Sequence, residues 1–137
     1  MFERLQRLEE NIVQLQRFRD MHSLEDVRKD RHLEWSLRYG LLEAIQIVID
    51  VSCHLVSRDN LGMPSTRSEC IKLLQQAGYI SDALASTLLG MVGLRNILVH
   101  EYIRIELERL YNLLDRIDDF RAFVKEITPY LSQGGST

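Results

Sequence analysis

The sequence predicts an all-α protein, a bundle of about five helices. Apolar residues recur at three- and four-residue steps along most of the chain, which is the spacing of one face of an α-helix. Short clusters of capping and helix-breaking residues separate these stretches. The length of 137 residues is sufficient for one domain with its own core, and no internal repeat or interdomain linker interrupts it.

The N-terminal stretch predicts an amphipathic helix, with polar and charged residues opposite its apolar side. The apolar side consists of Leu5, Leu8, Ile12, Leu15 and Phe18. Its broad polar face indicates a helix on the outside of the bundle or across a partner subunit. The pattern then breaks, and Ser23 and Asp26 have the spacing of an N-terminal cap for the next helix.

The second helix is expected to run from Ser23 to Val56 and to form the centre of the bundle. In its C-terminal half, Leu, Ile, Val and Ala residues cover most of the circumference, and only a centrally placed helix can bury them all. Glu43, Gln46 and Asp50 interrupt this apolar segment, so a membrane span is not expected.

The middle of the chain predicts a turn and two further helices. Residues 58–64 are rich in residues that favour loops, and they end at a proline, which disfavours helix in the residue before it. A short third helix is expected over residues 68–74, with Gly78 as its C-terminal stop. Ser81-Asp82 then offers a cap for a fourth helix, which leads the chain to Arg95.

The fourth predicted helix has a thin side made of small residues. These are Ala83, Ala85, Gly90 and Gly93. Close approach by the backbone of a second copy is one explanation for them, and the ordinary occurrence of small residues in helices is the other.

A long final helix is expected from Ile103, with an apolar stripe in a near-heptad repeat that closes the bundle. Thr128-Pro129 is expected to end it. The polar, glycine-containing residues 132–137 predict a disordered tail, which leaves residues 1–131 as the single domain.

Composition limits the classes of function and the compartment. A formal net charge of −3 argues against a general nucleic-acid coat, which requires many cationic contacts to phosphates, but it is compatible with a local basic cleft. Cys53 and Cys70 form neither a CxxC pair nor a group with histidines at metal-ligand spacing. We therefore expect two reduced thiols and no metal or other cofactor. The N-terminus lacks the apolar core of a signal peptide, so a cytoplasmic protein is expected.

Residues 93–102 carry four polar side chains that packing does not require, namely Arg95, Asn96, His100 and Tyr102. The arginine fork matches phosphate oxygens, and histidine exchanges protons near neutral pH. This pair suits phosphodiester cleavage without a metal. Arg95 would neutralise charge that builds on the phosphate oxygens, and His100 would take a proton from the attacking ribose 2′-hydroxyl or give one to the leaving oxygen.

The spacing of the motif restricts its geometry. At about 100° per residue, Arg95 and His100 lie about 140° apart around a continuous helix, so they do not share a face. Asn96 and His100 do share one, so the carboxamide can fix the imidazole tautomer. Two geometries bring the arginine and histidine to one phosphate: the helix stops between them, or a second copy of the chain supplies the missing half.

The motif resembles the signature of HEPN domains, which is an arginine, a polar residue, three variable residues and a histidine. With Tyr102 two residues after His100, the chain looks like the HepT group, small helical toxins paired with a minimal nucleotidyltransferase antitoxin called MntA. The resemblance implies a four-helix up-and-down core and a homodimeric, metal-independent ribonuclease that cleaves RNA. It implies Arg95 and His100 as catalytic residues, Asn96 as their support, and Tyr102 as the residue that the antitoxin modifies with AMP.

Two other classes of function are compatible with the same residues. The first is a helical binding module that engages a nucleotidyltransferase without cutting anything. The second is a structural bundle in which Arg95 forms a surface salt bridge and His100 ends a helix. Tyr102 alone is equally compatible with a packing residue whose hydroxyl reaches water.

Overall fold

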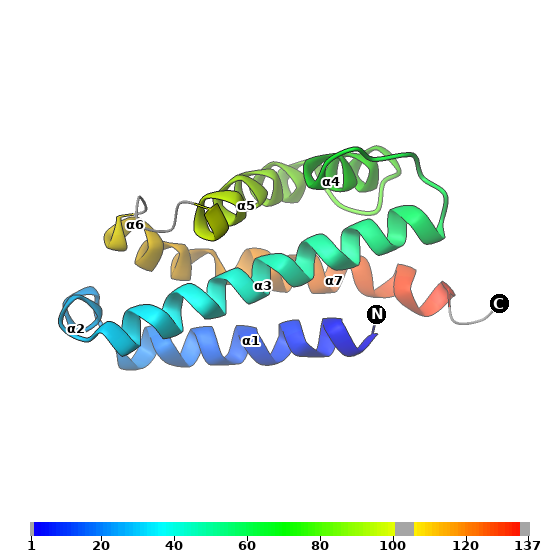
Figure 1. The fold of residues 1–137 in the computed structure, drawn as a ribbon. Helices are drawn as coiled ribbons and strands as arrows, with labels where there is room; N and C mark the ends of the chain where they lie inside the picture. Colours follow the sequence, from blue (N-terminus) through cyan, green and yellow to red (C-terminus); the bar gives the residue numbers. More distant parts are fainter. Residues whose placement is uncertain (1, 101–105, 135–137) are drawn as a thin grey trace.

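The computed structural model describes residues 2–100 and 106–134, and these residues fold into a helical bundle (Figure 1). The elements are α1 Phe2–Met21, α2 Leu24–Lys29, α3 Arg31–Arg58, α4 Arg67–Gln76, α5 Asp82–His100, α6 Leu107–Asn112, the 3-10 helix η2 Leu113–Arg116, and α7 Ile117–Gly134. The all-α fold class is thereby confirmed. The four long helices α1, α3, α5 and α7 form the body of the bundle.

Helix α3 lies at the centre, with α1 on one side, α4 and α5 on the other, and α7 behind it (Figure 1). Its apolar residues are buried around most of the circumference, as the sequence predicted. Phe120 and Phe123 of α7 are among the largest fully buried side chains of the core. By length and composition alone, α3 and α5 are apolar enough to cross a membrane. Both helices pack in the core here, and core helices share that composition.

The second predicted helix is in fact two helices, α2 and α3, which are separated at Asp30. The predicted cap at Ser23 is confirmed, because the Asp26 backbone N–H donates to Ser23 Oγ and the Ser23 N–H donates to the Asp26 carboxylate. Asp30 leaves the helical region with φ −132° and ψ 109°, and its carboxylate accepts from the His32 N–H at 2.9 Å. A second cap therefore restarts the helix.

The final helix also differs from its prediction. The predicted start at Ile103 lies outside the described residues. From Leu107 onward the chain forms α6, the short η2 and α7 instead of one helix, and Pro129 lies inside α7. Ile127 and Leu131 on either side of the proline are buried in the core, so tertiary packing carries the helix past it. Residues 132–134 of the predicted tail continue α7, and residues 135–137 lie outside the described residues.

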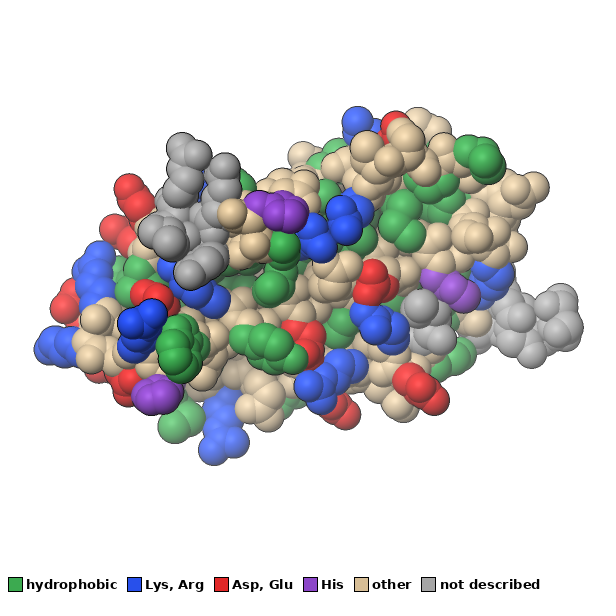
Figure 2. Space-filling model, in the orientation of Figure 1, with side chains coloured by type: hydrophobic (Ala, Val, Ile, Leu, Met, Phe, Trp, Pro, Cys, Tyr) green, Lys and Arg blue, Asp and Glu red, His purple; other side chains and the backbone are tan. Residues whose placement is uncertain are grey.

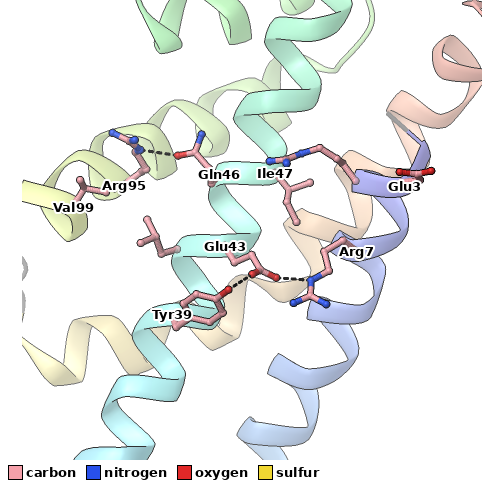
Figure 3. Close-up of a pocket in the computed structure, with 10 residues that line it drawn as sticks. Glu3, Arg7, Tyr39, Glu43, Gln46, Ile47, Arg95 and Val99 are labelled. Carbon is pink, nitrogen blue, oxygen red and sulfur yellow. Dashed lines mark hydrogen bonds and ion pairs between the residues drawn. The ribbon is translucent and has the colours of Figure 1, made fainter.

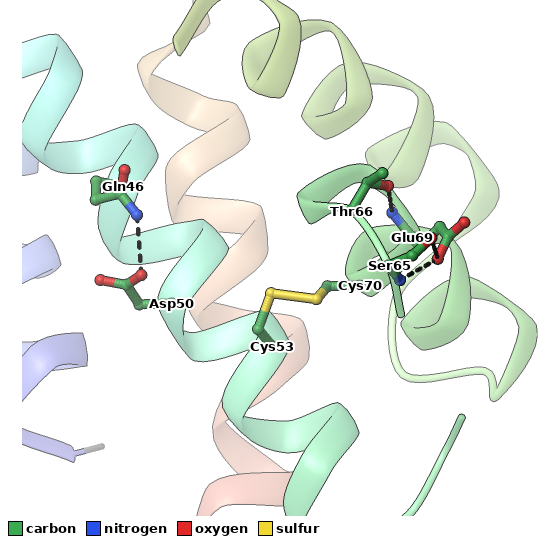
Figure 4. The surroundings of a disulfide bond; sticks show 7 residues. All are labelled: Gln46, Asp50, Cys53, Ser65, Thr66, Glu69 and Cys70. Carbon is green, nitrogen blue, oxygen red and sulfur yellow. Dashed lines mark hydrogen bonds between the residues drawn. A yellow bond between two sulfur atoms is a disulfide. The ribbon is translucent and has the colours of Figure 1, made fainter. Parts of the chain in front are cut away.

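The expectation of two reduced thiols is wrong, because Cys53 of α3 and Cys70 of α4 form a disulfide with their Cα atoms 5.1 Å apart (Figure 4). The loop after α3 reverses the chain, with left-handed backbone at Asn60 and Gly62, and it returns α4 along α3. The sequence spacing gave no sign of this pairing, since it depends on how two helices pack.

Candidate functional site

Helix α5 places the motif at the edge of the bundle. Ser81 caps its start, as predicted, by accepting from the Leu84 N–H at 3.2 Å. Leu94 and Leu98 anchor its last two turns in the core, whereas Asn96 and His100 are exposed. The helix is unbroken from Asp82 to His100. The first of the two predicted geometries, in which the helix stops within the motif, is therefore excluded.

Arg95 is partly buried, and its Nε faces Gln46 of α3 (Figure 3). Its Nε donates to Oε1 of Gln46 at 2.9 Å, and its Nη1 donates to Oδ1 of Asn96 at 3.2 Å. Burial lowers the pKa of Arg95, as does the positive charge of Arg67, while Asp50 acts in the opposite direction. Neither of these two hydrogen bonds goes to a carboxylate, so within the part of the chain that the structure describes no bonded anion cancels the charge of the guanidinium.

The other motif residues are only partly brought together. Asn96 bonds to Arg95 in this structure, whereas the sequence paired it with His100. His100 is the last residue of α5 and its side chain is exposed. Tyr102 lies outside the described residues.

A pocket of about 560 Å³ opens beside Arg95, between α1, α3 and α5 (Figure 3). Its size is that of a small-molecule or nucleotide site. Its polar lining includes Arg4, Arg7, Tyr39, Glu43, Gln46 and Arg95, and Leu42, Ile47 and Val99 supply apolar walls.

Glu43 organises the α1 side of this pocket. Its Oε1 accepts from Arg7 Nε and from Asn11 Nδ2, both at 2.8 Å, and its Oε2 accepts from the Tyr39 hydroxyl at 2.5 Å. Burial raises the pKa of Glu43, but the hydrogen bonds from Tyr39, Arg7 and Asn11 outweigh it and lower the pKa to about 2. The cluster therefore holds an ionised carboxylate between α1 and α3.

Charges of both signs are interspersed over the face of the molecule shown in Figure 2. Many arginines are paired with carboxylates, among them Arg19 with Asp115 at 2.8 Å and Arg28 with Glu25 at 2.7 Å. Arg95, by contrast, forms no ion pair with any described residue. A broad basic surface is thus absent from this face, and the motif arginine is not bonded to a carboxylate among the described residues.

Sequence reasoning missed the roles of Gln46 and Asp50, which it treated only as interruptions of an apolar helix. Nε2 of Gln46 donates to Oδ1 of Asp50 at 2.9 Å (Figure 4), and Asp50 forms an ion pair with Arg4. The signal was present in the spacing. Glu43, Gln46 and Asp50 follow one another at three- and four-residue steps, which places three polar groups on one face of the central helix.

The fold and site together define a class of protein, a helical bundle that carries an arginine and a histidine at the end of one core helix. The chain belongs to the family Ribonuclease HepT-like, which matches residues 8–127. The "mRNA nuclease HepT" of Shewanella oneidensis is 31% identical over 101 residues, covering 73% of this chain and 76% of that protein. The "tRNA nuclease HepT" of Aphanizomenon flos-aquae is 30% identical over 93 residues, covering 66% and 63%.

A solved structure has the same fold. It is the tri-AMPylated HEPN toxin of Shewanella oneidensis in complex with MNT antitoxin. The TM-score is 0.85 at 26% identity, and the match covers 93% of this chain and 96% of that one. The resemblance predicted from the motif is confirmed at the level of family and fold.

Proposed function

We propose that this protein is the toxin of a toxin–antitoxin pair and a metal-independent endoribonuclease, with Arg95 and His100 as its catalytic residues. The observation that carries the proposal is that α5 runs unbroken through both residues and that the Arg95 guanidinium bonds to no carboxylate among the described residues. The relatives named as mRNA and tRNA nucleases support RNA as the substrate.

The active form is a homodimer with one composite cleft. Because the motif arginine and histidine lie about 140° apart on one helix, a second copy is needed to bring both kinds of group to one phosphate. The surface near the motif suits such a contact, since Trp35, Tyr39 and Val99 are exposed. An added Cβ at Gly90 or Gly93 meets nothing within 4 Å, so a second backbone has room to approach α5.

The reaction follows from the two side chains. The ribose 2′-hydroxyl attacks the adjacent phosphorus and gives its proton to a neutral imidazole, while the bond from phosphorus to the 5′-oxygen breaks and that oxygen gains a proton. The products are a 2′,3′-cyclic phosphate and a 5′-hydroxyl. Arg95 stabilises the negative charge on the phosphate oxygens, His100 exchanges the proton, and Asn96 supports the orientation of Arg95.

Regulation is proposed to come from a minimal nucleotidyltransferase antitoxin like the MNT partner of the Shewanella toxin. The Tyr102 oxygen would attack the α-phosphorus of ATP, and pyrophosphate would leave. The added phosphate places negative charge beside the motif, where it repels or blocks the substrate phosphate. Intact-mass analysis after incubation with ATP and the antitoxin should show an AMP adduct that Tyr102→Phe removes. An unchanged adduct pattern in Tyr102→Phe would assign the modification to another residue.

The direct test is cleavage of RNA by the purified protein in the presence of EDTA. Arg95→Ala and His100→Ala should each abolish the cyclic-phosphate product and the toxicity in cells, with little change in thermal unfolding, because His100 is exposed and Arg95 only partly buried. Arg121→Ala is the matched control, since that arginine lies on α7 and pairs with Asp118. Loss of cleavage in EDTA, or variants that are inactive only because they unfold, would contradict the proposal.

The same experiment separates the alternative function, a binding module for a nucleotidyltransferase that cuts nothing. That function predicts tight binding of the antitoxin and no RNA cleavage by the wild type in any buffer.

A toxin that acts on cellular RNA also has to work in the cytoplasm, and this is the compartment we propose.

A further inference from the structure

Gln46 is the residue of α3 that holds the catalytic arginine. Its Oε1 accepts from Nε of Arg95 at 2.9 Å (Figure 3). A bond at Nε fixes the base of the guanidinium and leaves its outer edge, Nη1 and Nη2, to approach another group. Nη1 is also within 3.2 Å of Asn96, and Nη2 bonds to no acceptor among the described residues. The outer edge is the part that matches phosphate oxygens.

The orientation of the Gln46 amide is itself fixed. Its Nε2 donates to Oδ1 of Asp50 at 2.9 Å, one turn further along α3, and Asp50 forms an ion pair with Arg4 of α1. An ionised carboxylate only accepts, so the NH₂ of Gln46 has to face Asp50 and its carbonyl has to face Arg95. This chain of contacts joins α1, α3 and α5 and ends at the motif arginine.

The chain of contacts also preserves the charge of Arg95. Gln46 is neutral, and the negative charge of Asp50 is paired with Arg4. A carboxylate in place of Gln46 would form an ion pair with Arg95 and compete with a substrate phosphate for the same donors. The carboxamide orients the guanidinium without that competition.

We propose that Gln46 is a positioning residue for Arg95, oriented by Asp50 and Arg4. It directs at the RNA phosphate a guanidinium that bonds to no carboxylate among the described residues. This inference rests on the proposed ribonuclease function and deepens it. Gln46 acts through Arg95 and touches neither the substrate nor the reacting atoms.

The test uses Gln46→Glu and Gln46→Leu in the full-length protein. Gln46→Glu should raise KM for a short single-stranded RNA about tenfold or more, because the new carboxylate occupies the arginine. The binding constant for the 2′-O-methyl analogue, which lacks the attacking hydroxyl, should depend less on salt. The slope of its logarithm against log salt should fall by about 0.7, the value for one lost phosphate contact on a single strand.

Gln46→Leu keeps the charge of Arg95 and removes its anchor. It should therefore lower kcat about tenfold while the salt slope stays that of the wild type. Gln16→Glu is the matched control, because Gln16 is half-buried and donates to Asp20 four residues on, just as Gln46 does to Asp50, but holds no described arginine. The control should change neither KM nor the salt slope.

The two levels of the proposal fail in different ways. A wild type that cleaves no RNA removes the ribonuclease function, and the role of Gln46 falls with it. An active wild type whose Gln46→Glu variant keeps the wild-type KM and salt slope removes the role of Gln46 alone. The role of Gln46 would also be overturned if the loss of RNA cleavage in its variants only followed the fraction of unfolded protein, measured by circular dichroism.

Discussion

Arg7 and Arg95 line the same pocket, Arg7 from α1 and Arg95 from α5, and both bond through Nε to a side chain of α3 between them (Figure 3). The acceptor for Arg7 is the carboxylate of Glu43, at 2.8 Å, whereas the acceptor for Arg95 is the carboxamide of Gln46, at 2.9 Å. The two acceptors lie one turn apart on the same helix. The geometry of the two bonds is similar, and the charge of the acceptor is the difference.

We infer that this difference separates a structural arginine, Arg7, from the proposed catalytic arginine, Arg95. Glu43 is held ionised by three donors and draws the charge of Arg7 into a bond between α1 and α3. Gln46 carries no charge, so Arg95 is oriented but keeps its attraction for an anion. We therefore propose that, within one pocket, the choice between Glu and Gln as the acceptor decides whether an arginine stabilises the fold or remains available to bind a substrate anion.

Replacement of each arginine by lysine should separate the two roles and give the largest effect. Arg95→Lys keeps a charge but loses the Nε bond and the fork that meets two phosphate oxygens, so kcat/KM for RNA should fall about 100-fold. Arg7→Lys keeps an ion pair with Glu43 and should cost far less activity. Equal losses of kcat/KM in the two variants would show that the charge of the acceptor on α3 does not determine the role of each arginine.

The disulfide gives the next largest effect, on stability. It fixes α4 against α3, the helix that carries both acceptors, and closes a loop with a sequence separation of 17 residues. Loss of the bond should lower the free energy of unfolding by about 3 kcal/mol. Urea denaturation with and without dithiothreitol measures it, and Cys53→Ser combined with Cys70→Ser should abolish the effect of the reductant. A wild type whose free energy of unfolding does not change with reductant would contradict the stabilising role of the disulfide.

Because we propose a cytoplasmic location, where thiols are kept reduced, the protein with both cysteines reduced should still cleave RNA.

The carboxylate side of the comparison can be tested through pH. The pKa of Glu43 is lowered from an ordinary 4.5 to about 2, so its ionised form stabilises the fold at pH above 4.5, and this stabilisation is lost as the pH falls toward 2. Glu43→Gln should lower the free energy of unfolding at pH 7 by roughly 1.5–3 kcal/mol. It should also flatten the acid limb of the plot of unfolding free energy against pH, which is the part between about pH 4.5 and 2. Glu9→Gln, at an exposed position of α1, is the control. If the acid limb of the Glu43→Gln variant is as steep as that of the wild type, the Glu43 cluster is not the source of the pH dependence.

The smallest expected effect is that of Tyr39→Phe. The substitution removes one of the three donors to Glu43 and leaves Arg7 and Asn11 in place. The pKa of Glu43 should then be higher than in the wild type. The acid limb of the plot of unfolding free energy against pH should therefore move to higher pH. No movement of that limb would mean that the hydroxyl bond does not persist in solution.

Local sequence signals predicted the fold well where the interaction was local. The cap at Ser23 and the stop at Gly78 depend on residues a few positions apart, so the sequence shows them directly. Pro129 was misread because Ile127 and Leu131 are held in the core by other helices, and long-range packing overrode the local rule. The Cys53–Cys70 bond was missed for the same reason.

The candidate site divides in the same way. Arg95 and His100 could be proposed from residue types and spacing, because the chemistry of phosphodiester cleavage restricts the choice of side chains, and their catalytic role stays a prediction. Gln46 could not be assigned from sequence, since its role depends on α3 and α5 lying side by side. Its periodicity with Glu43 and Asp50 indicated a polar face but not what that face contacts.

The most direct test of a nuclease site shared between two copies is complementation between inactive variants. Arg95→Ala and His100→Ala proteins are mixed, unfolded and refolded together, and heterodimers are confirmed by native mass spectrometry. A heterodimer then joins His100 of one copy with Arg95 of the other, so the mixture should regain RNA cleavage that neither variant shows alone. A mixture that contains heterodimers and stays inactive, or a wild type that cleaves RNA as a monomer, would contradict the shared site.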